Sequence, residues 1–389
     1  MLALLGAQFL SALADNALLI AAIALMKLAG QADRISWIQA GFILPFIVLA
    51  PFAGAFADSL PKGRVMLIGN AIKLGGTGLM LTGVYPIAAY LIVGIGATVY
   101  SPAKYGILSQ FFGADRLVKA NGWLEGSTIA AILLGVVLGG MLADKSLTLA
   151  LVSVIAIYAA AAVLNLFIPR LHPERNAGSW RFAKISQEFW GVLRILGREP
   201  AARMSLIGTS LFWGSGATLR LMLFVWVPVA LGINDNQTPA NLMGALSIGI
   251  VIGAVLASVM VKLQDVRPAY IGGLMIGPVI LLLSVQTALL PVVLLLIVLG
   301  ISGGLFVVPL NALLQRIGHR SVGAGRALAT QNLYENIAML LLVSGYGLAA
   351  KLPVIQAVSG FGAFMFVGVA MLAWTSRQNM KFPKLDENS

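Results

Sequence analysis

Six charged residues lie inside long apolar segments, and their side chains are the ones in this chain best suited to chemistry. They are Asp15, Lys73, Lys104, Glu125, Arg220 and Glu335. A charge in hydrocarbon costs about 3 kcal/mol by insertion scales, so such side chains usually face a protein interior or a wet cavity and carry function. Because the set holds both signs, it predicts a cavity that accepts a zwitterion or an anion.

Asp15 and Arg220 are expected to contact the substrate near mid-membrane. Asp15 shares a helical face with Gln8 and Ser11. Its carboxylate suits an ammonium group, a proton or a cation; the alternative is a structural pair with a buried Lys or Arg. The planar guanidinium of Arg220 suits phosphate or carboxylate; the alternative is an Asp15–Arg220 salt bridge. Lys73 either extends to the membrane surface or neutralises a neighbour.

Five further polar residues complete the predicted substrate-binding set. Asn16 follows Asp15 directly. Lys104 and Glu125 lie near the cytoplasmic ends of their spans, where a mutual ion pair that moves with gating is favoured over direct substrate contact. Gln331 and Glu335 share one helical face at i, i+4. They either line the cavity or hydrogen-bond to another helix.

Composition places these residues in a membrane. The 389-residue chain is 59% hydrophobic and 10% charged, with a mean hydropathy of +0.93, whereas soluble domains are about 45–50% apolar and 25% charged. A spanning helix needs about 20 apolar residues, so we predict an all-α membrane protein with spans at 2–29, 36–57, 65–84, 86–110, 120–143, 146–168, 203–231, 240–262, 268–287, 289–314, 323–350 and 353–375.

The +12 net charge is explained by where the basic residues lie, not by nucleic-acid binding. Six of the connections and ends hold nearly all of them: Lys62 and Arg64; Arg116 and Lys119; Arg170, Arg175, Arg181, Lys184, Arg194, Arg198 and Arg203; Lys262 and Arg267; Arg316, Arg320 and Arg326; and Arg377, Lys381 and Lys384. The alternate connections hold only Lys27, Arg34, Lys145 and Lys351. By the positive-inside rule, both termini are cytoplasmic.

The longest polar stretch divides the spans into two sets of six. We predict a bundle over 1–168, a cytoplasmic linker over 169–202, a second bundle over 203–376 and a cytoplasmic tail over 377–389. Apolar residues recur at helical spacing in the linker, at Phe182, Ile185, Phe189, Leu193 and Leu196. This helix either lies on the anionic inner leaflet or forms part of a solvated basic linker.

The two halves show a weak internal repeat. Pro102-Ala-Lys104 and Pro309-Leu-Asn311 end the fourth and tenth spans, Glu125 aligns with Glu335, and Gly135 aligns with Gly345. Two repeated six-helix bundles with the substrate site at their interface are typical of secondary transporters, which work by alternating access.

The loop Gly54-x3-Asp58-x3-Lys62-Gly63-Arg64 resembles the signature loop of the major facilitator superfamily, although the spacing from the aspartate to the basic turn is stretched. The resemblance implies that the aspartate joins a cytoplasmic charge network near the eleventh helix. We therefore predict a gating role for Asp58, Lys62, Arg64 and Arg326.

Longer stretches resemble one branch of that superfamily, the bacterial lysophospholipid transporters. They begin at Gln8, Tyr100, Val118, Ser127, Leu206, Trp226 and Val307, and include Gln8-Phe-Leu-Ser-Ala-Leu-Ala-Asp15-Asn16 and Tyr100-Ser-Pro-Ala-Lys104. This resemblance implies inward movement of lysophosphatidylethanolamine and related lysolipids across the inner membrane. A cytoplasmic-face acyltransferase then re-acylates them. We expect a monomer among membrane lipids, without cofactor or metal.

The sequence carries arguments against two other function classes. A facilitator-type exporter of drugs or other small amphiphiles shares the composition and span count, and only the motif stretches argue against it. A membrane acyltransferase should carry a His-x4-Asp pair, and a nucleotide-driven pump a glycine-rich phosphate loop. Neither pattern occurs in the sequence, and the absence of cysteine removes thiol chemistry. We therefore predict a transporter and not an enzyme.

Overall fold

The computed structural model describes residues 2–30, 35–169, 171–173, 182–233, 237–263, 265–349 and 352–379. Apart from an isolated bridge between Lys262 and Asp265, the regular elements within these ranges are helices. Several basic residues used in the topology prediction lie outside the described residues, namely Arg34, Arg170, Arg175, Arg181, Lys351, Lys381 and Lys384. Most of the predicted C-terminal tail lies outside them as well.

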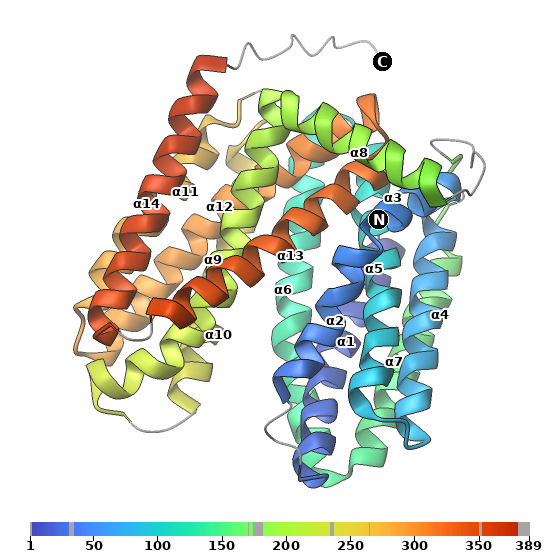
Figure 1. The fold of residues 1–389 in the computed structure, drawn as a ribbon, viewed down its shortest axis with the longest axis horizontal. Coiled ribbons are helices and arrows are strands. Elements are labelled where there is room, and N and C mark those ends of the chain that lie inside the picture. Colours follow the sequence, from blue (N-terminus) through green and yellow to red (C-terminus); the bar gives the residue numbers. More distant parts are fainter. Residues whose placement is uncertain are drawn as a thin grey trace. The chain divides into compact units, whose positions relative to one another are not determined.

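The helices follow the predicted spans closely (Figure 1). They are α1 (Leu2–Leu28), α2 (Ile35–Val48), α3 (Ala50–Ser59), α4 (Lys62–Leu81), α5 (Pro86–Phe111), α6 (Ala114–Lys145), α7 (Leu147–Leu166), α8 (Phe182–Arg198), α9 (Pro200–Leu231), α10 (Gln237–Met260), α11 (Arg267–Ser284), α12 (Leu289–Ser321), α13 (Ala324–Ala349) and α14 (Val354–Asn379). The all-α prediction is confirmed.

Among the described residues, eight helices are long and apolar enough to cross a membrane, or nine if α2 and α3 form one bent span. The chain turns by 67° between α2 and α3, because Pro51 lacks an N–H and its ring crowds the preceding turn. The helices α4, α11 and α13 coincide with the remaining predicted spans. They are shorter or more polar, so the count of twelve stays a prediction.

The chain divides into two compact units. Unit 1 comprises Met1–Phe111, Ser127–Arg194 and Gln315–Leu333, and unit 2 comprises Phe112–Gly126, Ile195–Leu314 and Tyr334–Ser389. The helices α6, α8, α12 and α13 therefore each contribute to both units. The bundle boundaries expected from the sequence, at 168 and 203, stay a prediction.

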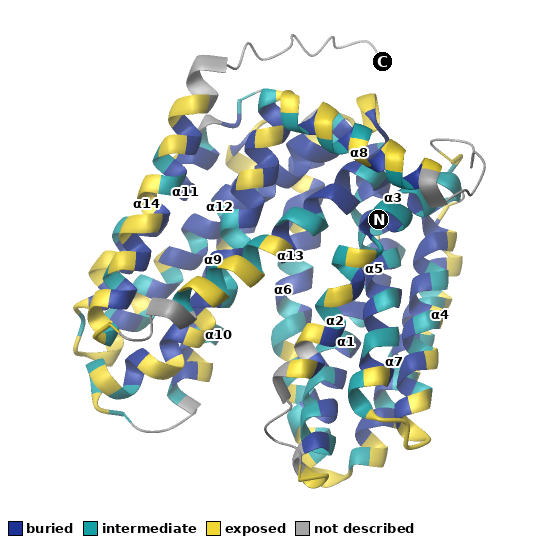
Figure 2. Cartoon of the chain, in the orientation of Figure 1, coloured by how far each residue is buried: buried dark blue, intermediate teal, exposed yellow. Residues whose placement is uncertain are grey.

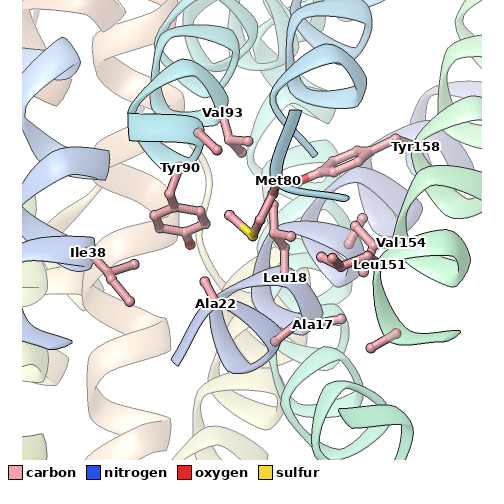
Figure 3. Packing of buried hydrophobic residues seen from close by; sticks show 14 of the residues in the cluster. Ala17, Leu18, Ala22, Ile38, Met80, Tyr90, Val93, Leu151, Val154 and Tyr158 are labelled. Atoms are coloured by element: carbon pink, nitrogen blue, oxygen red, sulfur yellow. The ribbon is translucent and has the colours of Figure 1, made fainter. Parts of the chain in front are cut away.

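The core of unit 1 is built from α1, α2, α4, α5 and α7. Small residues of α1 and larger side chains such as Met80, Tyr90 and Leu151 fill it (Figure 3). The helix α6 packs closely on α1: a Cβ atom on Gly135 would lie 2.5 Å from the Leu13 carbonyl oxygen. Small residues at such a contact let two helix backbones approach closely. The aligned Gly345 has no such neighbour among the described residues, so the repeat does not extend to this contact.

In unit 2, α11 packs along α14, and α14 also packs on α9.

Exposed apolar side chains lie in the middle of helices as well as at their ends, for example Val152 and Val163 on α7 and Phe364 and Val367 on α14 (Figure 2). Water would disfavour so much exposed hydrocarbon, whereas a bilayer solvates it. These surfaces fit the predicted membrane location.

The linker forms the predicted helix, α8, but its apolar stripe is not free. Ile185, Phe189, Val192 and Leu196 are buried, whereas Trp190 is exposed. Since this stripe packs within the protein, it is not the surface that could lie on a lipid leaflet. The sequence pattern predicted the helix correctly but did not indicate what covers its apolar side.

Candidate functional site

Asp15 is half of a buried ion pair in unit 1. Lys73 Nζ lies 2.7 Å from Asp15 Oδ2, with side-chain exposures of 2% for Lys73 and 19% for Asp15. Tyr158 donates a 2.5 Å hydrogen bond to Asp15 Oδ1. Both carboxylate oxygens are therefore engaged, one by Lys73 and one by Tyr158, and Asp15 is the more exposed partner of the pair. Of the two alternatives for Lys73, the structure shows the neutralising one.

Tyrosines surround the Lys73 ammonium. Its Nζ lies 4.8 Å from the ring centroid of Tyr100 and 5.7 Å from that of Tyr158. It also donates to Ser11 Oγ at 3.0 Å. Aromatic faces attract cations most strongly where water is excluded. The cluster thus compensates the burial of a charge that would otherwise cost several kcal/mol.

A polar row continues from this pair toward the start of α1. Ser11 donates to Asn70 Oδ1 at 2.7 Å, and Gln8 donates to Thr128 Oγ1 at 2.5 Å. Asn70 Nδ2 and the Tyr100 hydroxyl are buried without a hydrogen-bond partner among the described residues. Such donors are where a cavity inside a protein usually takes up water.

Asn16 has a local role in the structure. Its Nδ2 donates to the Ala12 carbonyl oxygen at 2.8 Å, within the same helix. Its Cβ lies where a side chain on Gly135 would have to fit, 2.9 Å from the position of such a Cβ atom. These contacts support the α1–α6 packing, and substrate binding by Asn16 stays a prediction.

Arg220 lies on α9 in unit 2, and its side chain is exposed. Within the part of the chain that the structure describes, its guanidinium makes no hydrogen bond or ion pair. An unpaired guanidinium inside an apolar span is costly to maintain. This exposure makes Arg220 the strongest candidate in unit 2 for binding an anionic group.

Glu125 is buried in unit 2 and accepts a 2.8 Å hydrogen bond from Asn311 Nδ2. Asn311 occupies the repeat position that corresponds to Lys104, which lies in unit 1 with its Nζ 4.6 Å from the Tyr105 ring. Gln331 and Glu335 are both buried. The Lys104–Glu125 pair and the substrate contacts of these residues stay predictions.

Asp58 joins the charge network that the loop motif predicts, but by a different contact. Its Oδ1 accepts from the Gly325 N–H at 2.8 Å, and its Oδ2 accepts from the Arg326 N–H at 3.1 Å. These are among the first N–H groups of α13, which have no partner within the helix and carry the positive end of its dipole. Asp58 therefore caps α13 from another segment of the chain.

Two glycines shape this cap. Gly323 has φ 101°, a conformation that favours glycine, and a Cβ there or on Gly325 would collide with the Asp58 carboxylate. On the opposite side, a Cβ on Gly54 would lie 2.7 Å from the Cα of Arg326. The carboxylate therefore fits because Gly323 and Gly325 lack side chains, and α3 approaches α13 closely because Gly54 lacks one.

The basic residues of the network take distinct positions. Lys62 is buried and pairs with Asp58 at 2.7 Å. The Arg326 guanidinium lies 2.9 Å from Glu188 Oε2 of α8. Both side chains of this pair are more exposed than those of Lys62 and Asp58. Arg64 is exposed, with no ion pair among the described residues. The predicted Asp58–Arg326 link thus exists through the backbone, and the guanidinium serves a contact with α8.

Sequence reasoning missed Tyr158, Glu188, Gly323 and Gly325. The last two could have been found, since Gly323-Ala-Gly325 directly precedes Arg326. Tyr158 is the one residue with a polar group between Ser153 and Asn165. An isolated hydroxyl in an apolar run of this kind indicates a buried hydrogen-bond partner. Across the residues that the structure describes, no group of three or more His, Asp or Glu side chains is placed to hold a metal ion.

Comparison with known proteins gives consistent matches. The family model described as Major Facilitator Superfamily matches residues 4–343. A protein of Enterobacter sp. (strain 638), named lysophospholipid transporter LplT, is 50% identical over 385 residues, which cover 97% of this chain and 96% of the relative. The Citrobacter koseri protein of the same name is likewise 50% identical, with the same coverage.

Solved structures share the fold at low sequence identity. The human organic anion transporter MFSD10 (TETRAN) superposes with a TM-score of 0.76 at 18% identity, covering 94% of this chain and 99% of its own. The E. coli fucose:proton symporter FucP gives a TM-score of 0.77 at 13% identity, with coverages of 96% and 97%. At these identities the likeness bears on the fold alone.

Proposed function

Because the chain belongs to the major facilitator superfamily, in the family of bacterial proteins named lysophospholipid transporter LplT, we propose that it carries lysophospholipids across the bacterial inner membrane. Its substrates are lysophosphatidylethanolamine and related lysolipids, moved inward to the cytoplasmic leaflet. There a lysophospholipid acyltransferase consumes them by adding the second chain. The protein acts as a monomer with both termini in the cytoplasm.

The observation that carries this proposal is the arrangement around Asp15. Lys73 neutralises its carboxylate, and the Asp15 side chain stays 19% exposed. A neutralised carboxylate binds a bare cation weakly, but its remaining lone pairs can accept hydrogen bonds from an ammonium headgroup that brings its own phosphate. The exposed guanidinium of Arg220 suits that phosphate. Each charge of the headgroup therefore has a counterpart in the chain.

The transport cycle is alternating access. Asp15 and Arg220 bind the headgroup, and Asn16, Gln331 and Glu335 add polar contacts. Lys104 and Glu125 form an ion pair that rearranges when the cytoplasmic side opens. The Asp58 cap on α13, which involves Lys62 and the Arg326 backbone, forms and breaks once per cycle, and Arg64 takes part in the same gating.

Reconstituted transport tests the proposal. Purified protein in liposomes should move lysophosphatidylethanolamine labelled on its headgroup, with protein-free liposomes as the blank. Arg220→Gln should lower the rate at least tenfold, because a charged hydrogen bond to phosphate is worth about 1.5–3 kcal/mol. Arg203→Gln, at an exposed arginine near the cytoplasmic end of the same helix, is the matched control and should leave the rate nearly unchanged.

A facilitator-type exporter of drugs or other small amphiphiles is the alternative. It would show drug efflux without lysolipid movement in the same liposomes. Equal rates for the parent and Arg220→Gln would contradict the assigned headgroup site, while leaving the substrate assignment in place.

A further inference from the structure

Unit 2 contains an open groove between α9 and α13 that none of the charged sites uses. Its volume is about 330 Å³, and its walls include Ile207 and Leu211 of α9 and Ile337, Ala338 and Leu341 of α13. Ile337 is 39% exposed and Leu341 65% exposed. The groove is therefore open along one side, and a flexible chain can enter it sideways without threading through an opening.

The lining is almost wholly hydrocarbon. Two lining residues carry a hydroxyl, Ser210 of α9 and Tyr334 of α13. The Ser210 hydroxyl donates a 2.6 Å hydrogen bond to the Leu206 carbonyl oxygen. That hydroxyl is satisfied within its own helix and has no need of a polar ligand. The groove thus suits a ligand made of CH₂ groups.

Polarity changes along α13 beside the groove. Glu335, a buried polar residue, lies one turn before Ala338, which lines the groove, and Tyr334 lines the groove at the level of Glu335. A molecule lying along α13 across this step would need a polar end and an apolar end. A lysophospholipid has that form, with one headgroup and one chain.

Resting on the function proposed above, we propose that this α9–α13 groove seats the single acyl chain of the transported lysolipid. Ligand pockets usually range from about 300 to 1,000 Å³, and this groove is at the lower end of that range. A groove this small favours one chain over a pair of chains. The groove therefore selects lysolipids over two-chain phospholipids and sets a preference for chain length.

The groove fixes the position of the acyl chain but adds little to the binding affinity. Lipid tails are as apolar as leucine, so moving a chain from bilayer to groove gains packing contacts and little hydrophobic free energy. Filling the groove should consequently impair long-chain substrates, whose chain must go there, and spare short-chain ones. The readout is a ratio of rates for two substrates with the same headgroup.

The test compares lysophosphatidylethanolamine carrying a 16-carbon chain with one carrying a 6-carbon chain, in proteoliposomes. Leu341→Trp fills the groove, and overpacking of this kind should lower the long-chain rate by about tenfold relative to the short-chain rate. Leu294→Trp, at another exposed leucine of unit 2, on α12, is the matched control and should leave the ratio unchanged. Ile337→Trp is a second filling variant, which should act in the same direction.

Each outcome of this experiment either supports or overturns the groove proposal. An unchanged ratio in both filling variants, or an equal change in Leu294→Trp, overturns the groove proposal while parental transport upholds the proposed function. A parent that moves neither lysolipid overturns both proposals. Loss of the long-chain rate alone, in either filling variant, supports the groove.

Discussion

The ammonium of Lys73 and the carboxylate of Asp15 lie 2.7 Å apart, on α4 and α1, and each is the counter-charge that makes the other tolerable inside unit 1. Lys73 is the more deeply buried of the two. Removing one partner of a buried pair leaves an uncompensated charge, which is more damaging than removing both.

Lys73→Met should therefore destabilise the protein by about 3–5 kcal/mol, since Asp15 loses its counter-ion. The double variant Lys73→Met with Asp15→Leu should recover a large part of that loss, because no isolated charge remains. Thermal unfolding of the purified variants in detergent measures both effects. A double variant less stable than Lys73→Met would show that the two residues are not coupled in this way.

Tyr158→Phe should weaken the same site more mildly. It removes the 2.5 Å hydrogen bond to Asp15 Oδ1, and a hydrogen bond to a charged group is worth about 1.5–3 kcal/mol. Tyr90→Phe is the control, because the Tyr90 hydroxyl makes only a 3.5 Å contact with the Asp15 carbonyl oxygen. Unfolding midpoints measured side by side should rank Tyr158→Phe well below Tyr90→Phe; equal midpoints would argue against a strong Tyr158 bond.

Asp58→Asn should open the cap on α13. The amide lacks a second acceptor oxygen for the Arg326 N–H and leaves buried Lys62 without its counter-charge. Because the chain has no cysteine, Ala329→Cys, buried next to Gly54, can report the opening through its rate of thiol labelling. Labelling should accelerate at least tenfold on adding Asp58→Asn.

Glu188→Gln provides the contrast at the same end of α13. The Arg326–Glu188 pair is partly exposed, with Glu188 at 41%, and such pairs contribute about 0–1 kcal/mol. Labelling of Ala329→Cys should change by less than a few fold. If Glu188→Gln accelerated labelling as much as Asp58→Asn, the contact with α8 and not the cap would hold this region closed.

Gly54→Ala should lower the stability of the protein although it adds only one methyl group. The added carbon would lie 2.7 Å from the Arg326 Cα and 2.9 Å from the Ala329 Cβ, so α3 and α13 would have to separate. Gly75→Ala is the matched control, since among the described residues no atom beyond its own stretch of helix lies within 4 Å of its added carbon, and alanine favours a helix by about 1 kcal/mol relative to glycine. Unfolding midpoints should fall for the first variant and hold or rise for the second.

The helices were predictable because hydropathy and charge act locally along the chain. Most predicted span ends agree with α1 to α14 within a few residues. The break between α2 and α3 was not predicted, although Pro51 was visible. A proline inside a membrane span is often tolerated because neighbouring groups satisfy the freed backbone, so sequence alone did not show that this one would end a helix.

The candidate site was predictable in its members and not in its pairings. The sequence identified Asp15 and Lys73 as unusual charges, but their contact joins α1 to α4 across 58 positions. Hydropathy and spacing carry no information on which helix faces which. The same limit explains why Glu188 was missed as the partner of Arg326.

Residues Gln315–Leu333 come from the second half of the sequence and yet belong to unit 1. A gene divided in the connection before α8 would therefore make two polypeptides, neither of which has all the surfaces its own core requires. Such fragments should accumulate only when they are produced together, and evolution could not have exchanged one half for an unrelated six-helix bundle without replacing the Asp58 cap.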